Sequence, residues 1–219
     1  EPRENYPPTG VCINMELETN IKLLLGDCMD IMPKYPTDYF DLAIVDPPYR
    51  DKNQPTKDMR TNGSMESLKG KPNQKYFKEL YRVSKNQIIW GANNFELPQW
   101  KGFVCWKKKT IGITFTMSMV EIASLSENLG TTSKWIEIAP QDSNRIHPTQ
   151  KPVALYRWLL ENYATHTDKI LDTHLGSGSS AIAAHYFGVN EFLGIEIDQE
   201  YFDSAKNRFE KSTRQLQLI

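Results

Sequence analysis

The chain has 219 residues, of which 39% are hydrophobic and 11% aromatic, with 26 Lys and Arg against 27 Asp and Glu. This content excludes disorder over the whole chain and suffices for the core of one α/β domain. The sequence contains no apolar run of the ~18 residues that a transmembrane helix needs, and residues 1–10 lack the pattern of a signal peptide. Cys12, Cys28 and Cys105 are too few and too scattered for a disulfide framework or a zinc site. We therefore expect a cytoplasmic protein without a metal.

Positive charge is concentrated in one part of the chain. Residues 50–109 contain 14 Lys or Arg and 5 Asp or Glu, whereas the remainder contains 12 and 22. A basic segment on an acidic body indicates a polyanionic partner, and the alternative is a solvated, lysine-rich loop. Aromatic stacking and phosphate-attracting charge are combined where a tryptophan precedes three lysines. The candidate contacts are Arg50, Lys52, Trp106, Lys107, Lys108 and Lys109, while Trp90, Trp100, Trp135 and Trp158 are expected in the core.

Strands and helices alternate at both ends of the chain. The hydrophobic pattern predicts strands over 21–25 and 41–45 with a helical turn over 30–35 between them. Residues 50–75 show no hydrophobic period and predict a long mobile loop. The pattern then predicts a helix over 76–82 and a strand over 87–90. These are followed by a hairpin-rich edge of the sheet, made of 103–106, 120–125 and 135–138. The last third predicts a helix over 152–163, a strand over 169–172, a helix over 179–187, a strand over 192–196, and a helix that Asp198 caps and that ends near Arg208.

A glycine-rich turn, Asp172–Ala181, joins a predicted strand to a predicted helix. Gly176 and Gly178 allow the backbone to turn tightly and a ligand to approach the main chain. Glu196 ends the next strand, where its carboxylate can accept hydrogen bonds from ribose hydroxyls, as in nucleotide-binding βαβ units. The turn predicts a nucleoside cofactor, and both NAD and S-adenosylmethionine fit it.

The sequence Asp46-Pro47-Pro48-Tyr49 follows a buried strand and therefore projects from the carboxyl edge of the sheet, where open α/β sheets bind ligands. The Asp46 carboxylate and the Pro47 carbonyl can both accept hydrogen bonds from one exocyclic amino group. Pro48 holds these acceptors in place, and Tyr49 offers a face for stacking on a base. Two acceptors leave the amino lone pair free to attack an electrophilic methyl group.

The residues 46–49 resemble the catalytic motif of amino-methyltransferases that modify adenine N6 or cytosine N4. Residues 147–152, His-Pro-Thr-Gln-Lys-Pro, resemble the motif that precedes the cofactor turn in bacterial and phage DNA enzymes of that family, and residues 172–180 resemble the S-adenosylmethionine turn itself. The catalytic motif precedes the cofactor motif, which is the beta-class order; ribosomal-RNA and protein-glutamine methyltransferases with similar tetrapeptides usually have the opposite order. The resemblance covers residues 23–208. It implies a Rossmann-like methyltransferase fold in which a mixed, mostly parallel sheet is flanked by helices and carries a small DNA-facing insertion.

The resemblance also implies roles for individual residues. Asp46, Pro47, Pro48 and Tyr49 would be catalytic, without a covalent enzyme intermediate. Thr149 and Lys151 would bind the methionine carboxylate, and Asp27 with Cys28 would reach the adenine edge. The implied cofactor-binding set is Asp27, Cys28, Thr149, Lys151, Asp172, His174, Gly176, Gly178, Ser179, Ser180 and Glu196. Family members often carry Pro-Phe where Thr173-His174 stand and Thr where Ser180 stands, which leaves the glycines and acids in place.

The preferred reading is a site-specific DNA methyltransferase that acts on a flipped-out base, most often adenine N6 when the motif begins with Asp. The alternatives are a cytosine N4 enzyme, a non-catalytic nucleotide-binding module, and a dehydrogenase, which leaves residues 46–49 and 147–152 without a role. The sequence argues against cysteine catalysis, because methylation at cytosine C5 typically uses a Pro-Cys pair and no cysteine here follows a proline; His147 is expected to structure its loop. We expect an arm over 1–14 and one catalytic domain over 15–219, with a variable insertion over 101–146. DNA, bound in the nucleoid, is the expected partner, and a homodimer or a partner restriction endonuclease remain open.

Overall fold

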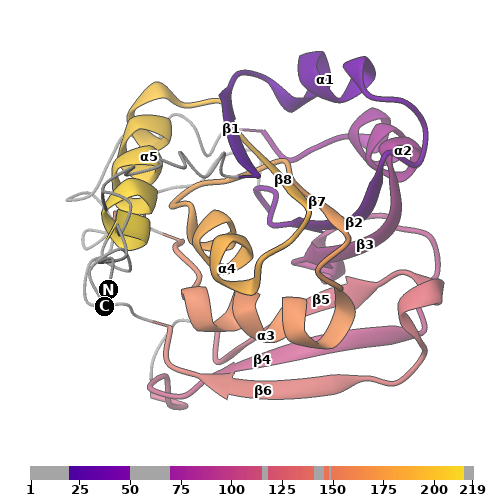
Figure 1. Ribbon diagram of the computed structural model, residues 1–219. Coiled ribbons are helices and arrows are strands. Elements are labelled where there is room, and N and C mark those ends of the chain that lie inside the picture. Colours follow the sequence, from indigo (N-terminus) through magenta and orange to yellow (C-terminus); the bar gives the residue numbers. More distant parts are fainter. Residues whose placement is uncertain (1–19, 50–69, 115–117, 141–145, 148, 215–219) are drawn as a thin grey trace, which may run out of the picture.

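The computed structural model describes residues 20–49, 70–114, 118–140, 146, 147 and 149–214. Its centre is an eight-stranded sheet with helices on both faces (Figure 1). The strands are β1 (Ile21–Leu25), β2 (Phe40–Val45), β3 (Ser84–Trp90), β4 (Gly102–Lys108), β5 (Val120–Leu125), β6 (Lys134–Ile138), β7 (Lys169–Asp172) and β8 (Glu191–Glu196). The helices are α1 (Cys28–Ile31), α2 (Gln74–Val83), α3 (Val153–Tyr163), α4 (Ser179–Phe187) and α5 (Gln199–Arg214), with 3-10 turns η1 (Met32–Lys34), η4 (Ala92–Asn94) and η5 (Glu127–Leu129).

The strand order is β1-β8-β7-β2-β3-β5-β4-β6. Strands β1, β8, β7, β2 and β3 are mutually parallel, and β6 is parallel to β4. Strand β5 is antiparallel to both of its neighbours, β3 and β4. It is therefore the one reversed strand of the described sheet, and its amino-terminal end lies at the edge where the other strands end. The expected mixed, mostly parallel α/β sheet is confirmed.

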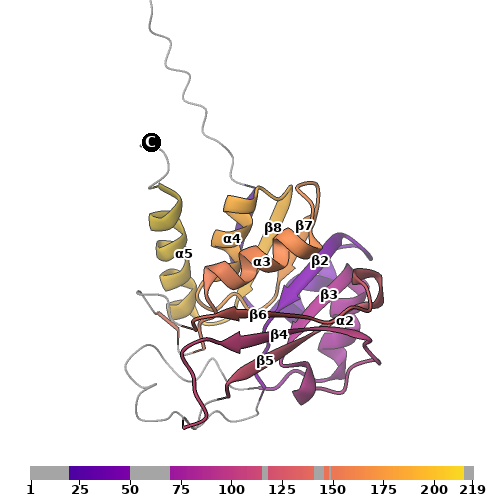
Figure 2. The ribbon, with the colours of Figure 1, turned by 90° about the horizontal axis from the view of Figure 1, so that it is seen from below.

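Strand β2 shows why its sequence is a continuous apolar run. Leu42 and Ile44 belong to the core cluster on the side of α3, α4 and α5, whereas Ala43 and Val45 belong to the cluster on the side of α1 and α2. Figure 2 shows α3 and α4 on one side of the sheet and α2 on the other. A strand covered on both faces has no polar face, so its sequence does not alternate.

Local capping explains where two helices begin. The Asp27 side chain accepts a hydrogen bond from the Met29 amide, so α1 begins at Cys28 and passes into η1, earlier than the predicted turn over 30–35. The Asn73 side chain caps α2 in the same way. Helix α5 continues to Arg214, beyond the predicted end near Arg208, because the buried residues Tyr201, Ala205 and Phe209 hold it against the sheet.

The predicted edge of the sheet needs two corrections. Strands β4 and β5 form the expected antiparallel pair, but β6 joins β4 in parallel and ends the sheet as an edge strand. Trp135 on β6 is therefore 64% exposed, not in the core. Trp106 is 2% exposed, packs edge-to-face on the buried Trp90, and donates its indole N–H to the Ile138 carbonyl, so it offers no surface for base stacking. Trp100 and Trp158 are half-buried.

The predicted arm over 1–14 and most of the predicted loop over 50–75 lie outside the described residues. In the predicted insertion over 101–146, strands β4, β5 and β6 continue the central sheet beyond β3. No helix among the described residues has the length and apolar character to cross a membrane.

Candidate active site

A cavity of about 520 Å³ opens at the carboxyl edge of the parallel strands. The Asp-Pro-Pro-Tyr motif follows β2 and the glycine-rich turn follows β7, and these two strands are neighbours. From them the chain order leads outward to β3 on one side and to β8 on the other, so the cavity lies where the strand order reverses. Such switch points are the usual ligand sites of open α/β sheets, and the volume is within the range of small-molecule pockets.

Tyr49 is held rigidly against Asp46. Its hydroxyl donates a 2.6 Å hydrogen bond to Asp46 Oδ1, and its ring lies edge-on to Phe95. The ring also lies directly over the backbone of Gly91, where a Cβ atom would come within 2.1 Å of Tyr49 Cε1. Gly91 has a φ of +68°, and its amide is bound by the Ile122 carbonyl. The site therefore depends on a glycine that the motifs do not include.

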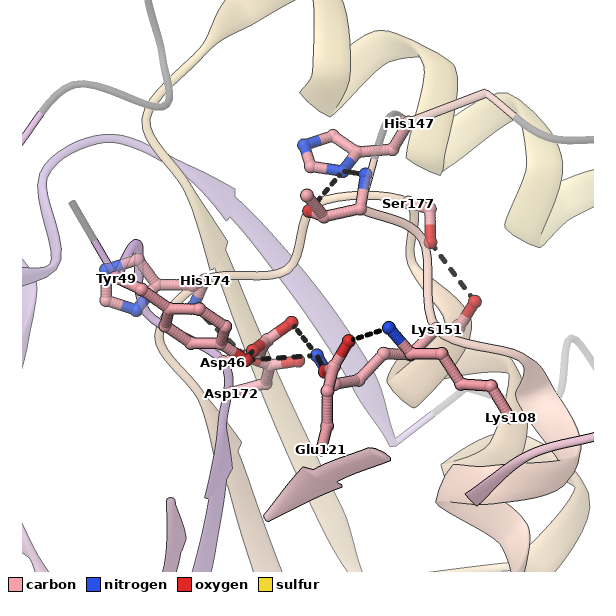
Figure 3. Close-up of polar contacts among 11 residues, drawn as sticks. Asp46, Tyr49, Lys108, Glu121, His147, Lys151, Asp172, His174 and Ser177 are labelled. Atoms are coloured by element: carbon pink, nitrogen blue, oxygen red, sulfur yellow. Dashed lines mark hydrogen bonds and ion pairs between the residues drawn. The ribbon is translucent and has the colours of Figure 1, made fainter. Parts of the chain in front are cut away.

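A buried ion cluster surrounds the other oxygen of Asp46 (Figure 3). The Lys151 Nζ atom lies 2.5 Å from Asp46 Oδ2 and 2.9 Å from Glu121 Oε2, although the second contact lacks the angle of a hydrogen bond. The Lys108 Nζ atom lies 2.5 Å from Glu121 Oε1. Lys151 was expected to bind the methionine carboxylate; in this structure two carboxylates of the protein already bind its ammonium group.

The charged state of this cluster follows from its contacts. Burial raises the pKa of the Glu121 carboxyl, but the Lys151 and Lys108 ammonium groups outweigh burial and hold that pKa at about 2. Burial lowers the pKa of Lys151, but Asp46 and Glu121 outweigh it and raise the pKa above its ordinary value. Burial and then the Asp46 charge raise the pKa of Tyr49. Near neutral pH, Glu121 is therefore ionised, Lys151 protonated and Tyr49 a neutral donor.

The glycine-rich turn is organised by the carboxylate of Glu196. Glu196 Oε2 accepts a 2.7 Å hydrogen bond from the Gly176 amide, and Oε1 accepts 3.0 Å bonds from the Ile197 and Asp198 amides. Gly176 lines the cavity with a φ of +53°. Gly178, with a φ of +73°, lies away from the cavity, and a Cβ atom there would contact Ala205 of α5 at 3.3 Å. Gly176 therefore faces the cavity, whereas Gly178 allows α4 and α5 to pack.

Three further residues of the predicted cofactor set support the turn from beneath. Asp172 accepts hydrogen bonds from the His174 amide at 3.0 Å and from the Ser180 hydroxyl at 2.6 Å. The Ser179 hydroxyl receives a 2.8 Å bond from the Arg208 guanidinium group, which also binds the Ser177 carbonyl. All three residues, Asp172, Ser179 and Ser180, are buried and do not line the cavity. The structure therefore does not place them where they were predicted to contact a cofactor.

Burial shifts two pKa values in this turn in opposite senses. It raises the pKa of Asp172 to about 7, despite the hydrogen bonds from Ser180 and the His174 amide. It lowers the pKa of His174 to about 4, so this imidazole is neutral at pH 7. His174 lines the cavity, with Nδ1 2.9 Å from the Thr173 hydroxyl, which in turn lies 2.6 Å from the Tyr76 hydroxyl.

The remaining predicted residues of the cavity are placed by two loops. Asp27 and Cys28 line it from the start of α1. Burial, and next to it the charge of Asp27, raises the pKa of the Cys28 thiol to about 12, which is unsuited to nucleophilic chemistry. His147 packs against Tyr201, and its Nδ1 atom accepts a 3.3 Å bond from the Thr149 amide, as expected of a residue that structures its loop. Thr149 lines the cavity beside it.

The predicted DNA contacts that lie among the described residues, Trp106, Lys107, Lys108 and Lys109, do not line the cavity. Arg50 and Lys52 lie outside the described residues. Lys108 is buried on Glu121 and cannot reach a phosphate, and Lys107 is paired with Glu137 at 3.2 Å. Lys109 is exposed. Of the predicted catalytic and cofactor residues, those that line the cavity are Asp27, Cys28, Asp46, Pro47, Pro48, Tyr49, Thr149, Lys151, His174, Gly176 and Glu196.

Sequence reasoning missed several residues of the cavity. Glu121 and Tyr156 contribute polar groups from β5 and α3, and Lys71 and Asn73 line the cavity just before α2. One signal was present for Glu121, namely a charged residue in a strand pattern that is otherwise uncharged and mostly apolar. Among the described residues, no group of three or more His, Cys, Asp or Glu side chains is arranged to hold a metal ion.

Comparisons with known proteins agree with this geometry. Residues 106–207 match the sequence model of the N6/N4 methyltransferase family, which is described as DNA methylase. YubD of Escherichia coli (strain K12) is 26% identical, over 90% of this chain and 93% of its own length. The type II methyltransferase M.HinfI of Haemophilus influenzae is 23% identical, over 85% of this chain and 67% of its own length.

Two solved structures have the same fold. The PvuII DNA methyltransferase, described as cytosine-N4-specific, matches with a TM-score of 0.60 at 13% identity, over 90% of this chain and 93% of that one. The M1.HpyAVI–SAM complex matches with a TM-score of 0.57 at 20% identity, over 86% of this chain and 98% of that one. The motifs, their common cavity and these matches agree: residues 106–207 match the N6/N4 DNA methylase family, and the chain has the fold of these two solved structures.

Proposed function

We propose that this protein transfers a methyl group from S-adenosylmethionine to N6 of an adenine that has been flipped out of DNA. The reaction class, S-adenosylmethionine-dependent methylation of a base amino group in DNA, follows from the family. The observation that carries the assignment to this cavity is that Asp46, Tyr49, Gly176 and Glu196 line one pocket, although they come from distant parts of the chain. Adenine is the finer part of the proposal and rests on the Asp at the first motif position.

The target amino group would bind at Asp46. The Asp46 carboxylate and the Pro47 carbonyl accept its two N–H groups, which keeps the nitrogen lone pair out of the ring and directed at the methyl group. The Tyr49 hydroxyl fixes Asp46 through the 2.6 Å bond to Oδ1. As the nitrogen gains positive charge, the Asp46 carboxylate stabilises it electrostatically. No covalent bond to the protein is needed at any stage.

The donor set beside the glycine-rich turn fits S-adenosylmethionine. Asp27 follows β1 and Glu196 ends β8, and these strands pair in parallel, so both carboxylates reach the same side of the cavity. Carboxylate oxygens have spare lone pairs for ribose hydroxyls and the adenine amino group. Gly176 leaves the backbone accessible to the methionine portion, with the Thr149 hydroxyl nearby. When bound, this cofactor supplies the electrophilic methyl group.

The surface beside the cavity mouth is suited to the DNA backbone. Lys71 lines the cavity, and Lys75 lies one turn further on, in the first turn of α2. Both are exposed, and the described part of the chain provides neither of them with a carboxylate partner. Phosphates that flank a flipped base would meet these two lysines. This assignment replaces Trp106 and Lys108, which are buried.

The test is methylation of DNA by the purified protein, followed by nucleoside analysis that separates N6-methyladenine from N4-methylcytosine. We expect N6-methyladenine from the wild type and none from Asp46→Ala, with the affinity for S-adenosylhomocysteine changed by less than about tenfold, or ~1.4 kcal/mol. N4-methylcytosine would overturn the choice of base. Binding of S-adenosylhomocysteine without turnover would favour the non-catalytic module, and binding of NAD instead would favour a dehydrogenase.

A further inference from the structure

Among the described residues, Glu121 is an acidic group in contact with the ion cluster of Asp46 that none of the three sequence motifs contains. It is the second residue of β5. Because β5 is antiparallel to β3, its first residues lie at the edge of the sheet where the cavity opens, and the Glu121 side chain lines that cavity. The β5 strand belongs to the region between residues 46–49 and 147–152, where the sequence predicted a DNA-facing insertion. Glu121 is partly buried and its Oε2 atom is fully so, which is unexpected for a carboxylate because ionised groups are seldom buried unless a partner compensates them.

Two lysines from different elements compensate Glu121, one on each oxygen. Lys108, at the end of β4, holds Oε1, and Lys151, before α3, holds Oε2. The same Lys151 ammonium group holds Asp46 Oδ2, and it also lies 3.4 Å from the Tyr49 hydroxyl and above the Trp90 ring. Lys151 thus lies between two carboxylates, as Figure 3 shows, and the Glu121 carboxylate draws it away from the catalytic aspartate.

This geometry has a consequence for the target amine. An ammonium group bound to Asp46 alone would occupy acceptor positions that the amine needs and would place a full positive charge beside the nitrogen that becomes positive in the transition state. An ammonium group shared with Glu121 leaves more of the Asp46 charge for the amine. Electrostatic stabilisation of this kind acts on the transition state more than on cofactor binding.

We propose that Glu121 is a positioning residue for methyl transfer, which acts by holding Lys151 and so keeps Asp46 available to the target amine. The proposal rests on the proposed function and extends it to a residue outside the motifs. A purely structural role makes a different prediction: if Glu121 served only to neutralise the buried Lys108, removal of both charges together would restore the enzyme.

The experiment compares single-turnover methylation of DNA by Glu121→Gln, Lys108→Met and the double variant. Glutamine keeps the shape of glutamate and removes its charge. We expect Glu121→Gln to lower the rate about ten- to hundredfold, as misplacement of a catalytic group does, while the S-adenosylhomocysteine dissociation constant changes less than about threefold. The double variant should remain as slow as Glu121→Gln, because Lys151 still lacks its second partner. Glu137→Gln is the control: it makes the same chemical change in the more exposed Lys107–Glu137 pair between β4 and β6, away from the cavity, and should keep the wild-type rate.

Several results would overturn the proposal. An unchanged rate in Glu121→Gln would show that Lys151 needs no second partner. A double variant restored to the wild-type rate would assign Glu121 to Lys108 alone. A cofactor affinity that falls in parallel with the rate would make Glu121 a cofactor ligand. If Glu121→Gln does not fold, the double variant decides between the roles, because it removes the Lys108 ammonium group together with the carboxylate that neutralised it. A wild type without methyl transfer would refute the proposed function itself, which the nucleoside analysis reports separately.

Discussion

Replacement of Gly91 by alanine would test how strictly Tyr49, which we propose is catalytic, must be placed. The new Cβ atom would lie 2.1 Å from Tyr49 Cε1, 2.5 Å from Cζ and 2.6 Å from Cδ1. Carbon atoms pack no closer than about 3.5 Å, so the ring must shift by more than about 1 Å, and the 2.6 Å bond between Tyr49 and Asp46 would be lost. Alanine at a φ of +68° adds about 1 kcal/mol of backbone strain.

A misplacement of about 1 Å in a catalytic group costs about a hundredfold in rate, so we expect single-turnover methylation by Gly91→Ala to fall by about that factor. S-adenosylhomocysteine affinity should stay near wild type, because Gly91 is outside the glycine-rich turn. Gly130→Ala is the control: it also imposes alanine on a positive φ, +101°, but its Cβ atom meets nothing within 4 Å. It should lose stability and keep the rate. A wild-type rate in Gly91→Ala, or equal losses in both variants, would refute the reasoning.

Three further predictions concern the cofactor side, the buried turn and the DNA surface. Glu196→Ala should weaken S-adenosylhomocysteine by about 2–4 kcal/mol in a calorimetric titration, and an unchanged affinity would mean that Glu196 is not the ribose ligand. Asp172, with its pKa raised by burial from 3.8 to about 7, keeps a proton in the folded state that the unfolded state releases, so its contribution to stability falls as pH rises through that range. His174, with its pKa lowered by burial from 6.5 to about 4, has the opposite effect between those values. We therefore compare the unfolding free energy of each variant with that of the wild type between pH 4 and 6.5. The difference should rise with pH in Asp172→Asn and fall with pH in His174→Phe, each by about 1.4 kcal/mol per pH unit. A variant whose unfolding free energy changes with pH in parallel with the wild type would contradict the pKa shift of the residue replaced. Lys71→Gln with Lys75→Gln should flatten the log–log salt dependence of DNA binding by up to about 0.9 per lysine that contacts a phosphate, and an unchanged slope would place the DNA elsewhere.

The two ends of the site were predictable from sequence because parallel strands impose their own geometry. Asp46 follows one apolar run and Gly176 follows another, and the carboxyl ends of parallel strands meet at one edge of a sheet. Local patterns were sufficient for this, since apolar runs and glycine turns depend on near neighbours in the chain. The bounds of β1, β5, β7 and α4 followed from the same local patterns.

Packing partners could not be predicted in the same way. A strand pattern states that a segment is buried, but it does not state the direction of the strand or its neighbour. The sequence of residues 106–108 predicts a stacking surface with basic charge. In the structure Trp106 faces the core and Lys108 faces Glu121, so both side chains are buried. The sequence predicts that Gly178 contacts a ligand. In the structure the lack of a Cβ atom at Gly178 instead leaves room for Ala205 of α5.

The sequence by itself determined the fold class, the resemblance to the N6/N4 DNA methylases and the position of Asp46 and the glycine-rich turn at one edge, because each of these depends on residues close together in the chain. Only the tertiary structure decided what surrounds Asp46. The reversal of β5 brings Glu121 to that edge, and the loop before α3 brings Lys151 between the two carboxylates. These contacts join residues 75 and 105 positions from Asp46 along the chain, and their energies depend on burial and distance, which no local pattern contains.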